Sequence, residues 1–177
     1  ERRYQRPRLS PDGKRLAVAV ETDNNQDIWI HEFERGTFSR FTFAPSSDFN
    51  PLWTPDNRTL IYNGEDPQFT IYQRPADGSS DTQLLLNKPI DTTPTSISPD
   101  GKWLVYSESS LANSSDIWLL PMDGDGTPRL FLQTAFGEGA AAISPDGRWL
   151  AYYSNESGQS EVYATPFPGG GSRVQIS

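Results

Sequence analysis

The chain has 177 residues with no cysteine and a single histidine, His31, which excludes a disulfide framework, a thiolate metal site and a multi-histidine zinc site. Its net charge is −8, but residues 1–15 carry +4 and the remaining residues carry −12. An acidic body argues against nucleic-acid binding, which depends on neutralising phosphates. No apolar run reaches the roughly 20 residues of a membrane helix, so we expect no direct membrane insertion.

A four-residue turn motif is the first repeated element along the chain. It occurs as Ser10-Pro11-Asp12-Gly13, Thr54-Pro55-Asp56-Asn57, Ser98-Pro99-Asp100-Gly101 and Ser144-Pro145-Asp146-Gly147, at spacings of 44, 44 and 46 residues. Proline presets φ in a type I turn, aspartate bonds nearby backbone, and glycine or asparagine accepts positive φ. We therefore predict a tight turn between two antiparallel strands in each copy, with each aspartate bonded inside its own repeat.

Strand-like segments follow every turn in the same order. An apolar stretch comes first, at Leu16–Val20, Leu60–Tyr62, Leu104–Tyr106 and Leu150–Tyr153. A second signature follows, as Asp27-Ile28-Trp29, Thr70-Ile71-Tyr72, Asp116-Ile117-Trp118 and Glu161-Val162-Tyr163. A further short strand is expected around Phe38–Thr42, Gln83–Leu86, Arg129–Leu132 and Arg173–Ile176.

With the strand before the turn, each repeat holds four strands, and a period of 40–50 residues is typical of propellers. One such sheet cannot bury both of its faces alone, so neighbouring sheets must stack. The sequence predicts an all-β propeller segment, 1–177, of four four-stranded antiparallel blades at about 4–43, 44–87, 88–133 and 134–177.

The turn, the spacing and the Asp-Ile-Trp strand together resemble TolB-like propeller repeats, the WD-like class with a Ser-Pro-Asp-Gly turn. The stretches Leu9–Leu16, Asp27–Trp29, Ser98–Tyr106, Asp116–Leu120 and Ser144–Tyr153 carry the resemblance. It is closest to propellers appended to bacterial serine/threonine kinases and to winged-helix regulators. Family rings usually have six or more blades, so the resemblance implies an arc of a larger propeller, with a four-blade ring or half of an assembled ring as alternatives.

The loop residues described below and the lack of catalytic motifs favour a non-catalytic protein-interaction or ligand-sensing module, and the resemblance implies a larger bacterial protein, periplasmic or cytoplasmic. The start at Glu1 agrees with an excised piece or a processed product. No Gly-x-Ser-x-Gly elbow, P-loop or kinase signature occurs, and a triad would have to use His31, so we predict no catalytic residues and no cofactor. Asp123–Gly126 contains part of a calcium-loop pattern without its closing glutamate, so we predict a hairpin loop and no metal. The alternative function is a propeller domain of, or accessory to, a hydrolase, with the channel gating substrate access.

Candidate binding residues lie in the connections that precede the first strand of a blade. Asp48, Asp91 and Glu138 share this offset, and the first strand lines the channel of a propeller. The three carboxylates are predicted to ring the channel mouth and attract a cation or a basic protein or peptide partner, although ordinary loop acids would also fit. Phe49 and Phe136 on the same face are aromatic anchors for a partner or fillers between blades.

An arc would leave an apolar face on the first blade and another on the fourth. Faces of hundreds of Å² mark association or aggregation. We therefore expect self-association through the terminal blades, or instability of the piece without further blades.

Overall fold

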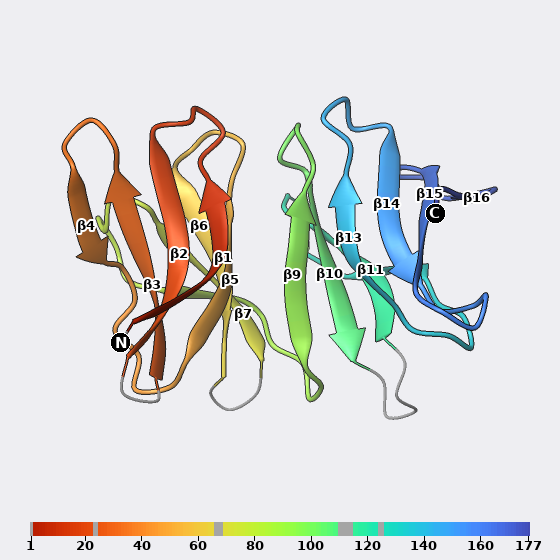
Figure 1. Cartoon of the computed structure of the whole chain (residues 1–177), viewed down its shortest axis with the longest axis horizontal. Helices are drawn as coiled ribbons and strands as arrows, with labels where there is room; N and C mark the ends of the chain where they lie inside the picture. Colours follow the sequence, from red (N-terminus) through yellow and green to blue (C-terminus); the bar gives the residue numbers. More distant parts are fainter. Residues whose placement is uncertain (1, 23–24, 66–68, 110–114, 124–125) are drawn as a thin grey trace. The chain divides into compact units, whose positions relative to one another are not determined.

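A computed structural model describes residues 2–22, 25–65, 69–109, 115–123 and 126–177. Every regular element in these ranges is a β-strand, and none of them contains a helix that could cross a membrane. The strands form four antiparallel sheets of four strands each, in chain order within each sheet. Figure 1 shows the strands as arrows coloured along the chain. The predicted all-β fold of four four-stranded blades is confirmed, and we number the sheets as blades one to four.

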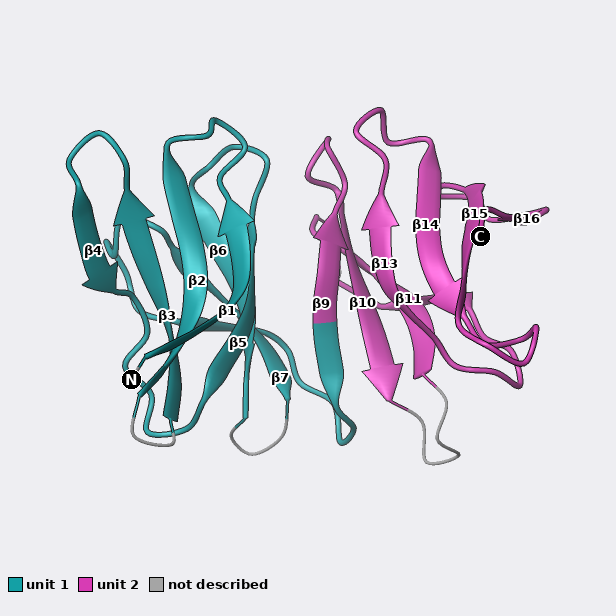
Figure 2. Ribbon diagram, in the orientation of Figure 1, with its two compact units in different colours: residues 1–93 teal, residues 94–177 magenta. Residues whose placement is uncertain are grey.

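The chain divides into two compact units, residues 1–93 and 94–177 (Figure 2). Unit 1 contains blades one and two. Blade one consists of β1 (Arg3–Leu9), β2 (Arg15–Thr22), β3 (Asn25–Glu32) and β4 (Thr37–Arg40). Blade two consists of β5 (Asp48–Trp53), β6 (Thr59–Gly64), β7 (Thr70–Pro75) and β8 (Gln83–Leu86).

Unit 2 contains blade four and all of blade three except the first two residues of β9. Blade three consists of β9 (Thr92–Ile97), β10 (Trp103–Ser109), β11 (Ser115–Pro121) and β12 (Arg129–Leu132). Blade four consists of β13 (Glu138–Ile143), β14 (Trp149–Ser154), β15 (Glu161–Pro166) and β16 (Val174–Gln175).

The repeated motif forms the predicted turn in all four blades. The residue at its fourth position has positive φ, at 71°, 64°, 73° and 71° along the chain, and its N–H donates to the carbonyl of the first position. Each aspartate accepts a hydrogen bond of 2.6 Å from the Ser or Thr hydroxyl two residues before it, and another of 3.0–3.1 Å from the N–H two residues after it. These bonds lower the pKa of all four carboxyls, so the aspartates are structural and bond within their blades as predicted.

Each unit has its own hydrophobic core, formed where two blades stack. In unit 1, Ile28 and Ile30 of blade one pack with Trp53, Leu60 and Tyr62 of blade two. The Trp53 indole N–H donates to the Arg8 carbonyl at 3.0 Å, so this tryptophan packs and anchors rather than recognising a ligand.

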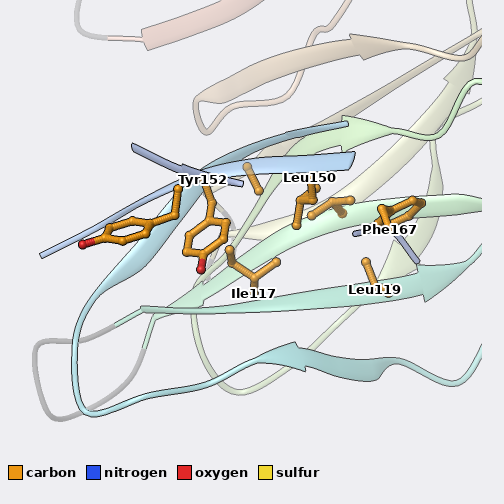
Figure 3. Packing of buried hydrophobic residues seen from close by; sticks show 8 residues of the cluster. Ile117, Leu119, Leu150, Tyr152 and Phe167 are labelled. Carbon is orange, nitrogen blue, oxygen red and sulfur yellow. The ribbon is translucent and has the colours of Figure 1, made fainter. Parts of the chain in front are cut away.

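In unit 2, blades three and four stack in the same way. Ile117 and Leu119 of blade three pack with Leu150, Tyr152 and Phe167 of blade four (Figure 3). Burial of these side chains is the main stabilising term for two stacked sheets.

A bulge interrupts the first strand in blades one, two and four, and the sequence did not predict it. The pairing register shifts around Arg6, Asn50 and Ala140, and these three residues have φ of 50°, 52° and 46°. Their spacing follows the repeat, and blade three has Pro94 at the corresponding position, where the ring excludes positive φ.

Candidate binding site: an interblade pocket in unit 1

Two of the three predicted carboxylates are buried. Asp48 and Glu138 are the first residues of β5 and β13, and 3% and 0% of their surfaces are exposed. Asp91 is half-buried in the connection before β9. The acids therefore differ in environment, and the prediction of three similar loop carboxylates missed the burial of two of them.

The blade position of Asp48 and Glu138 is occupied in blade three by Thr92, not by Asp91. Thr92 begins β9, lies 44 residues after Asp48 and 46 before Glu138, and is buried. Its hydroxyl donates to the Phe69 carbonyl at 2.7 Å, and its N–H donates to the same atom. Asp91 therefore lies one residue outside the repeated position.

The Asp48 carboxyl is held between two neighbouring strands with few polar partners. It accepts a hydrogen bond from the Thr42 hydroxyl, whose oxygen in turn accepts the Ile28 N–H at 2.9 Å. Burial raises the pKa of Asp48 to about 6, and the nearby negative charge of Asp27 acts in the same direction. Asp27 is already paired with Arg40 at 2.8 Å, which limits the support that this guanidinium gives to Asp48.

Gly64 provides the space that the Asp48 side chain occupies. It pairs with Asp48 across β5 and β6, and a Cβ on Gly64 would lie 2.8 Å from Asp48 Oδ1 and 3.1 Å from the Tyr72 ring. In blade four the corresponding pair is Glu138 with Ser154, so a side chain is present there. Glycine at position 64 is therefore a condition for the present placement of the carboxylate.

The two predicted aromatic anchors occupy different environments. Phe49 is half-buried, and its ring lies 5.7 Å from that of Phe69. Phe136 is 42% exposed in the connection before β13, where its N–H donates to the Thr134 hydroxyl. Phe136 is thus available to a partner, while Phe49 packs against the chain.

Asp48 lines a cavity of about 490 Å³ in unit 1. Its walls come from the β4–β5 connection, from Tyr62 and Gly64 of β6, from Tyr72 and Arg74 of β7, and from the β7–β8 connection. Small-molecule and side-chain pockets of this size combine apolar walls with a few polar groups. This interblade pocket is the candidate binding site.

Two acids and one base contribute charge to the interblade pocket. The Arg74 guanidinium donates to the Phe41 carbonyl at 2.6 Å and to the Ser80 carbonyl at 3.2 Å, so backbone oxygens hold it. Asp81 is exposed, and the neighbouring Thr82 hydroxyl lies 2.7 Å from the Tyr62 hydroxyl. Burial raises the pKa of Tyr62 to about 12, so this phenol stays neutral. The lining thus combines aromatic rings and two acids with one arginine whose guanidinium is already held by backbone oxygens, and this combination suits a further cationic group.

Unit 2 has a smaller cavity between the corresponding strands. It measures about 280 Å³ and is lined by Phe131, Tyr152, Thr165 and Arg173, among others, but not by Glu138. Glu138 accepts a hydrogen bond from the Thr134 hydroxyl. Burial raises its pKa, and the negative charge of Asp116 adds to the effect. The two units thus share a buried acid; in unit 1 the acid lines the cavity, whereas the unit 2 cavity between the corresponding strands does not include Glu138.

Arg74, Tyr62, Tyr72 and Asp81 were not singled out from the sequence. A comparison of the repeats contains one usable signal, because the blade position of Arg74 holds His31, Leu120 and Thr165 elsewhere. Within the described ranges no three acidic or histidine side chains are grouped to hold a metal ion. Of the predicted hairpin loop, Asp123 is exposed, whereas Gly124 and Asp125 lie outside the described residues.

Comparison with known proteins identifies the family. The model of the TolB beta propeller domain matches residues 3–114, which is more than half of the chain. The chain belongs to the TolB beta propeller domain family. The TolB-like resemblance inferred from the repeated turn is thereby confirmed.

Relatives of this TolB-type propeller are longer proteins. The chain is 26% identical over 153 residues to the uncharacterized peptidase YuxL of Bacillus subtilis (strain 168), covering 66% of the chain and 23% of that relative. Among solved structures, the putative TolB of Agrobacterium tumefaciens has a TM-score of 0.83 at 20% identity over 99% of this chain and 62% of its own. A puromycin-hydrolyzing peptidase of Mycobacterium tuberculosis has a TM-score of 0.79 at 16% identity over 100% of this chain and 31% of its own. The chain spans less than two thirds of each, which fits a partial propeller.

Proposed function

We propose that this TolB-type propeller segment is a non-catalytic protein-interaction or ligand-sensing module of a larger bacterial protein. Its interblade pocket in unit 1 binds a basic side chain of a protein or peptide partner. The larger protein is of the kind in which a propeller is appended to a kinase or to a winged-helix domain. The observation that carries the proposal is the Asp48 carboxylate, buried yet lining an open cavity of about 490 Å³.

The energetic argument rests on the raised pKa of Asp48. A carboxylate removed from water and given one hydroxyl partner is destabilised in its charged form, which is why its pKa rises to about 6. A lysine or arginine side chain that entered the pocket would restore part of the lost solvation and would favour the charged form. The half-buried Tyr72 ring on the pocket wall supplies a face for the stem or head of that side chain, and it is backed by the buried Tyr62 ring, whose centroid lies 6.0 Å away.

The exposed residues around the pocket support the same class of partner. Phe43 is 66% exposed on the pocket wall, and Asp81 adds a second negative charge. Aromatic contacts with a charged surround are common at protein-interaction sites. Phe136, exposed in unit 2, offers a second aromatic contact in that unit.

Isothermal titration calorimetry tests this proposal with a short arginine-rich peptide and its glutamate-rich counterpart as probes. We expect the basic peptide alone to bind, and Asp48→Asn to weaken it at least tenfold, about 1.4 kcal/mol. Asp123→Lys, which changes an exposed acid outside the pocket, is the matched control and should leave the affinity within twofold. Equal losses in both variants would show a diffuse charge effect and would contradict a site at Asp48.

A second candidate is a propeller domain of, or accessory to, a hydrolase, with its channel gating substrate access. It is favoured by the peptidase name of the Bacillus subtilis relative, of which this chain matches 23%. Under this candidate the parent protein hydrolyses peptides, and Asp48→Asn changes KM for basic peptides without abolishing turnover. A parent protein that lacks a hydrolase domain would exclude this candidate.

A further inference from the structure

The outer face of blade four consists of Trp149, Ala151, Tyr153, Val162, Ala164, Pro166 and Ile176. On β14 and β15 these residues pair directly, Trp149 with Pro166, Ala151 with Ala164 and Tyr153 with Val162. None of them is charged, and Trp149, Tyr153 and Val162 are 44%, 38% and 39% exposed. The alternate residues Leu150 and Tyr152 point to the opposite side and form the core of unit 2.

The same blade positions are buried wherever another blade follows within a unit. Ala151, Val162 and Ala164 correspond to Val105, Ile117 and Leu119 of blade three, which pack against blade four. In blade one they correspond to Ala17, Ile28 and Ile30, which pack against blade two. Ile176 holds the blade position of Phe41, because the Ile176 N–H donates to the Val162 carbonyl and the Phe41 N–H donates to the Ile28 carbonyl. Phe41 is buried in blade one. The outer face of blade four therefore has the pattern of a face that receives another blade.

Blade one carries the complementary face. The face that packs against the preceding blade is formed by residues of the first and second strands. In blade two these are Trp53, Leu60 and Tyr62, and in blade four they are Ile143, Leu150 and Tyr152. At these positions blade one has Leu9, Leu16 and Val18. Leu9 and Tyr4 are each 58% exposed, and β1 is exposed along its whole length. Leu16 is half-buried and Val18 is 5% exposed, so the open part of this face is Leu9 and Tyr4 on β1. One chain thus carries both halves of a blade-to-blade interface.

We propose that blade four of one copy stacks on blade one of a second copy, head to tail. Side-chain sizes favour the match. Ala151 and Ala164 of blade four are smaller than Val105 and Leu119 at the same positions of blade three, so the face of blade four can accept a larger side chain. On the other side, Trp29 of blade one is larger than Tyr72 and Tyr163 at the same blade position. Charge also favours it, because residues 1–15 carry +4 and residues 134–177 carry −2.

The geometry of this contact makes it heterologous, since two different faces meet. Such an interface grows into a closed ring or an open chain, whereas an interface between two identical faces stops at a dimer. The inference is independent of the interblade pocket and of its ligand.

Analytical ultracentrifugation of the 177-residue chain tests the contact with two single-face variants. Val162→Glu places a charge on the outer face of blade four, and Leu9→Glu places one on blade one. Both side chains are at least 39% exposed, so circular dichroism should show unchanged folding. Leu84→Glu, at a 58% exposed apolar position on β8, is the matched control.

The wild-type chain and Leu84→Glu should show a mass that rises with concentration above that of one chain. Each single-face variant alone should stay monomeric, with an association constant at least tenfold weaker. An equimolar mixture of Val162→Glu and Leu9→Glu should form dimers and nothing larger, because one intact interface remains. A monomeric wild type, self-association of either single-face variant on its own, or a mixture that fails to dimerise would each overturn the proposal.

Discussion

Units 1 and 2 contain the same interblade arrangement with different side chains. Each has a buried acid at the start of a first strand, Asp48 or Glu138, and each acid accepts a threonine hydroxyl. Unit 1 sets the shorter acid opposite glycine beside a cavity of about 490 Å³, whereas unit 2 sets the longer acid opposite Ser154, and Glu138 does not line the cavity of about 280 Å³. A repeated fold thus supplies the position, and the size of the side chains decides whether the acid can meet a ligand.

The largest expected effect comes from filling the space at Gly64. A methyl group there would lie 2.8 Å from the Asp48 carboxylate and 3.1 Å from the Tyr72 ring, so Gly64→Ala should lower the free energy of unfolding by about 1–3 kcal/mol. Urea denaturation measures the change. Ser154→Ala, at the same blade position in unit 2, should cost less than half as much, and equal costs would remove the distinction between the units.

Asp48→Asn tests the comparison of the two buried acids through the pH dependence of the free energy of unfolding. The folded chain binds a proton at Asp48 with a pKa of about 6, against 3.8 for the unperturbed group, so the folded state holds more protons between these values. Stability therefore falls as pH rises from about 4 to about 6, and the loss persists above pH 6. Asp48→Asn should remove the Asp48 contribution to this slope, leaving that of Glu138, and should raise the free energy of unfolding at pH 7.5 by about 1–2 kcal/mol.

Denaturation curves at pH 4, 5, 6 and 7.5 give that slope for the wild type and the variant. Glu138→Gln is the matched substitution in unit 2, where burial also raises the pKa. A slope that remains in Asp48→Asn with the wild-type size would show that Asp48 does not titrate in this range.

The smallest expected effect concerns the turns, which are alike in both units. Gly101 has φ of 73° and no atom within 4 Å of a Cβ, so Gly101→Ala should cost about 1 kcal/mol through backbone strain alone. Gly147→Ala, at φ of 71° in the next blade, should cost a similar amount. Gly169→Ala, also in open space but without positive φ, is the control, and a cost equal to that of Gly101→Ala would contradict the strain account.

The sequence predicted the fold well because the turn chemistry repeats. Ser-Pro-Asp-Gly specifies a local structure through proline φ, aspartate bonds and glycine freedom, and four copies at a 44–46-residue spacing specify stacked blades. The bulges at Arg6, Asn50 and Ala140 were not predictable in this way. The three bulges share no residue type, because an arginine, an asparagine and an alanine adopt the positive φ.

The site was predicted only in part, for a physical reason. The position of an acid near the start of the first strand selected Asp48 and Glu138 correctly. It also selected Asp91, although the repeated position in blade three is held by the next residue, Thr92. Burial of an acid depends on the residues of neighbouring strands, such as Gly64 opposite Asp48, and these are distant in sequence. Tyr72 joins the pocket only once blades one and two stack and has aromatic counterparts in every repeat, so no sequence pattern marks it, whereas Arg74 differs from its counterparts and could have been found by comparing the repeats.

The most direct test of a binding role for unit 1 is an NMR titration of the Asp48 side-chain carboxyl carbon against pH, with and without an arginine-rich peptide. The free chain should titrate with a midpoint near pH 6, in keeping with its buried position. The peptide should move that midpoint downward, because a cation beside the carboxylate favours the charged form. A midpoint near 3.8 in the free chain, or one that the peptide leaves unchanged, would contradict Asp48 as the group that receives the basic partner.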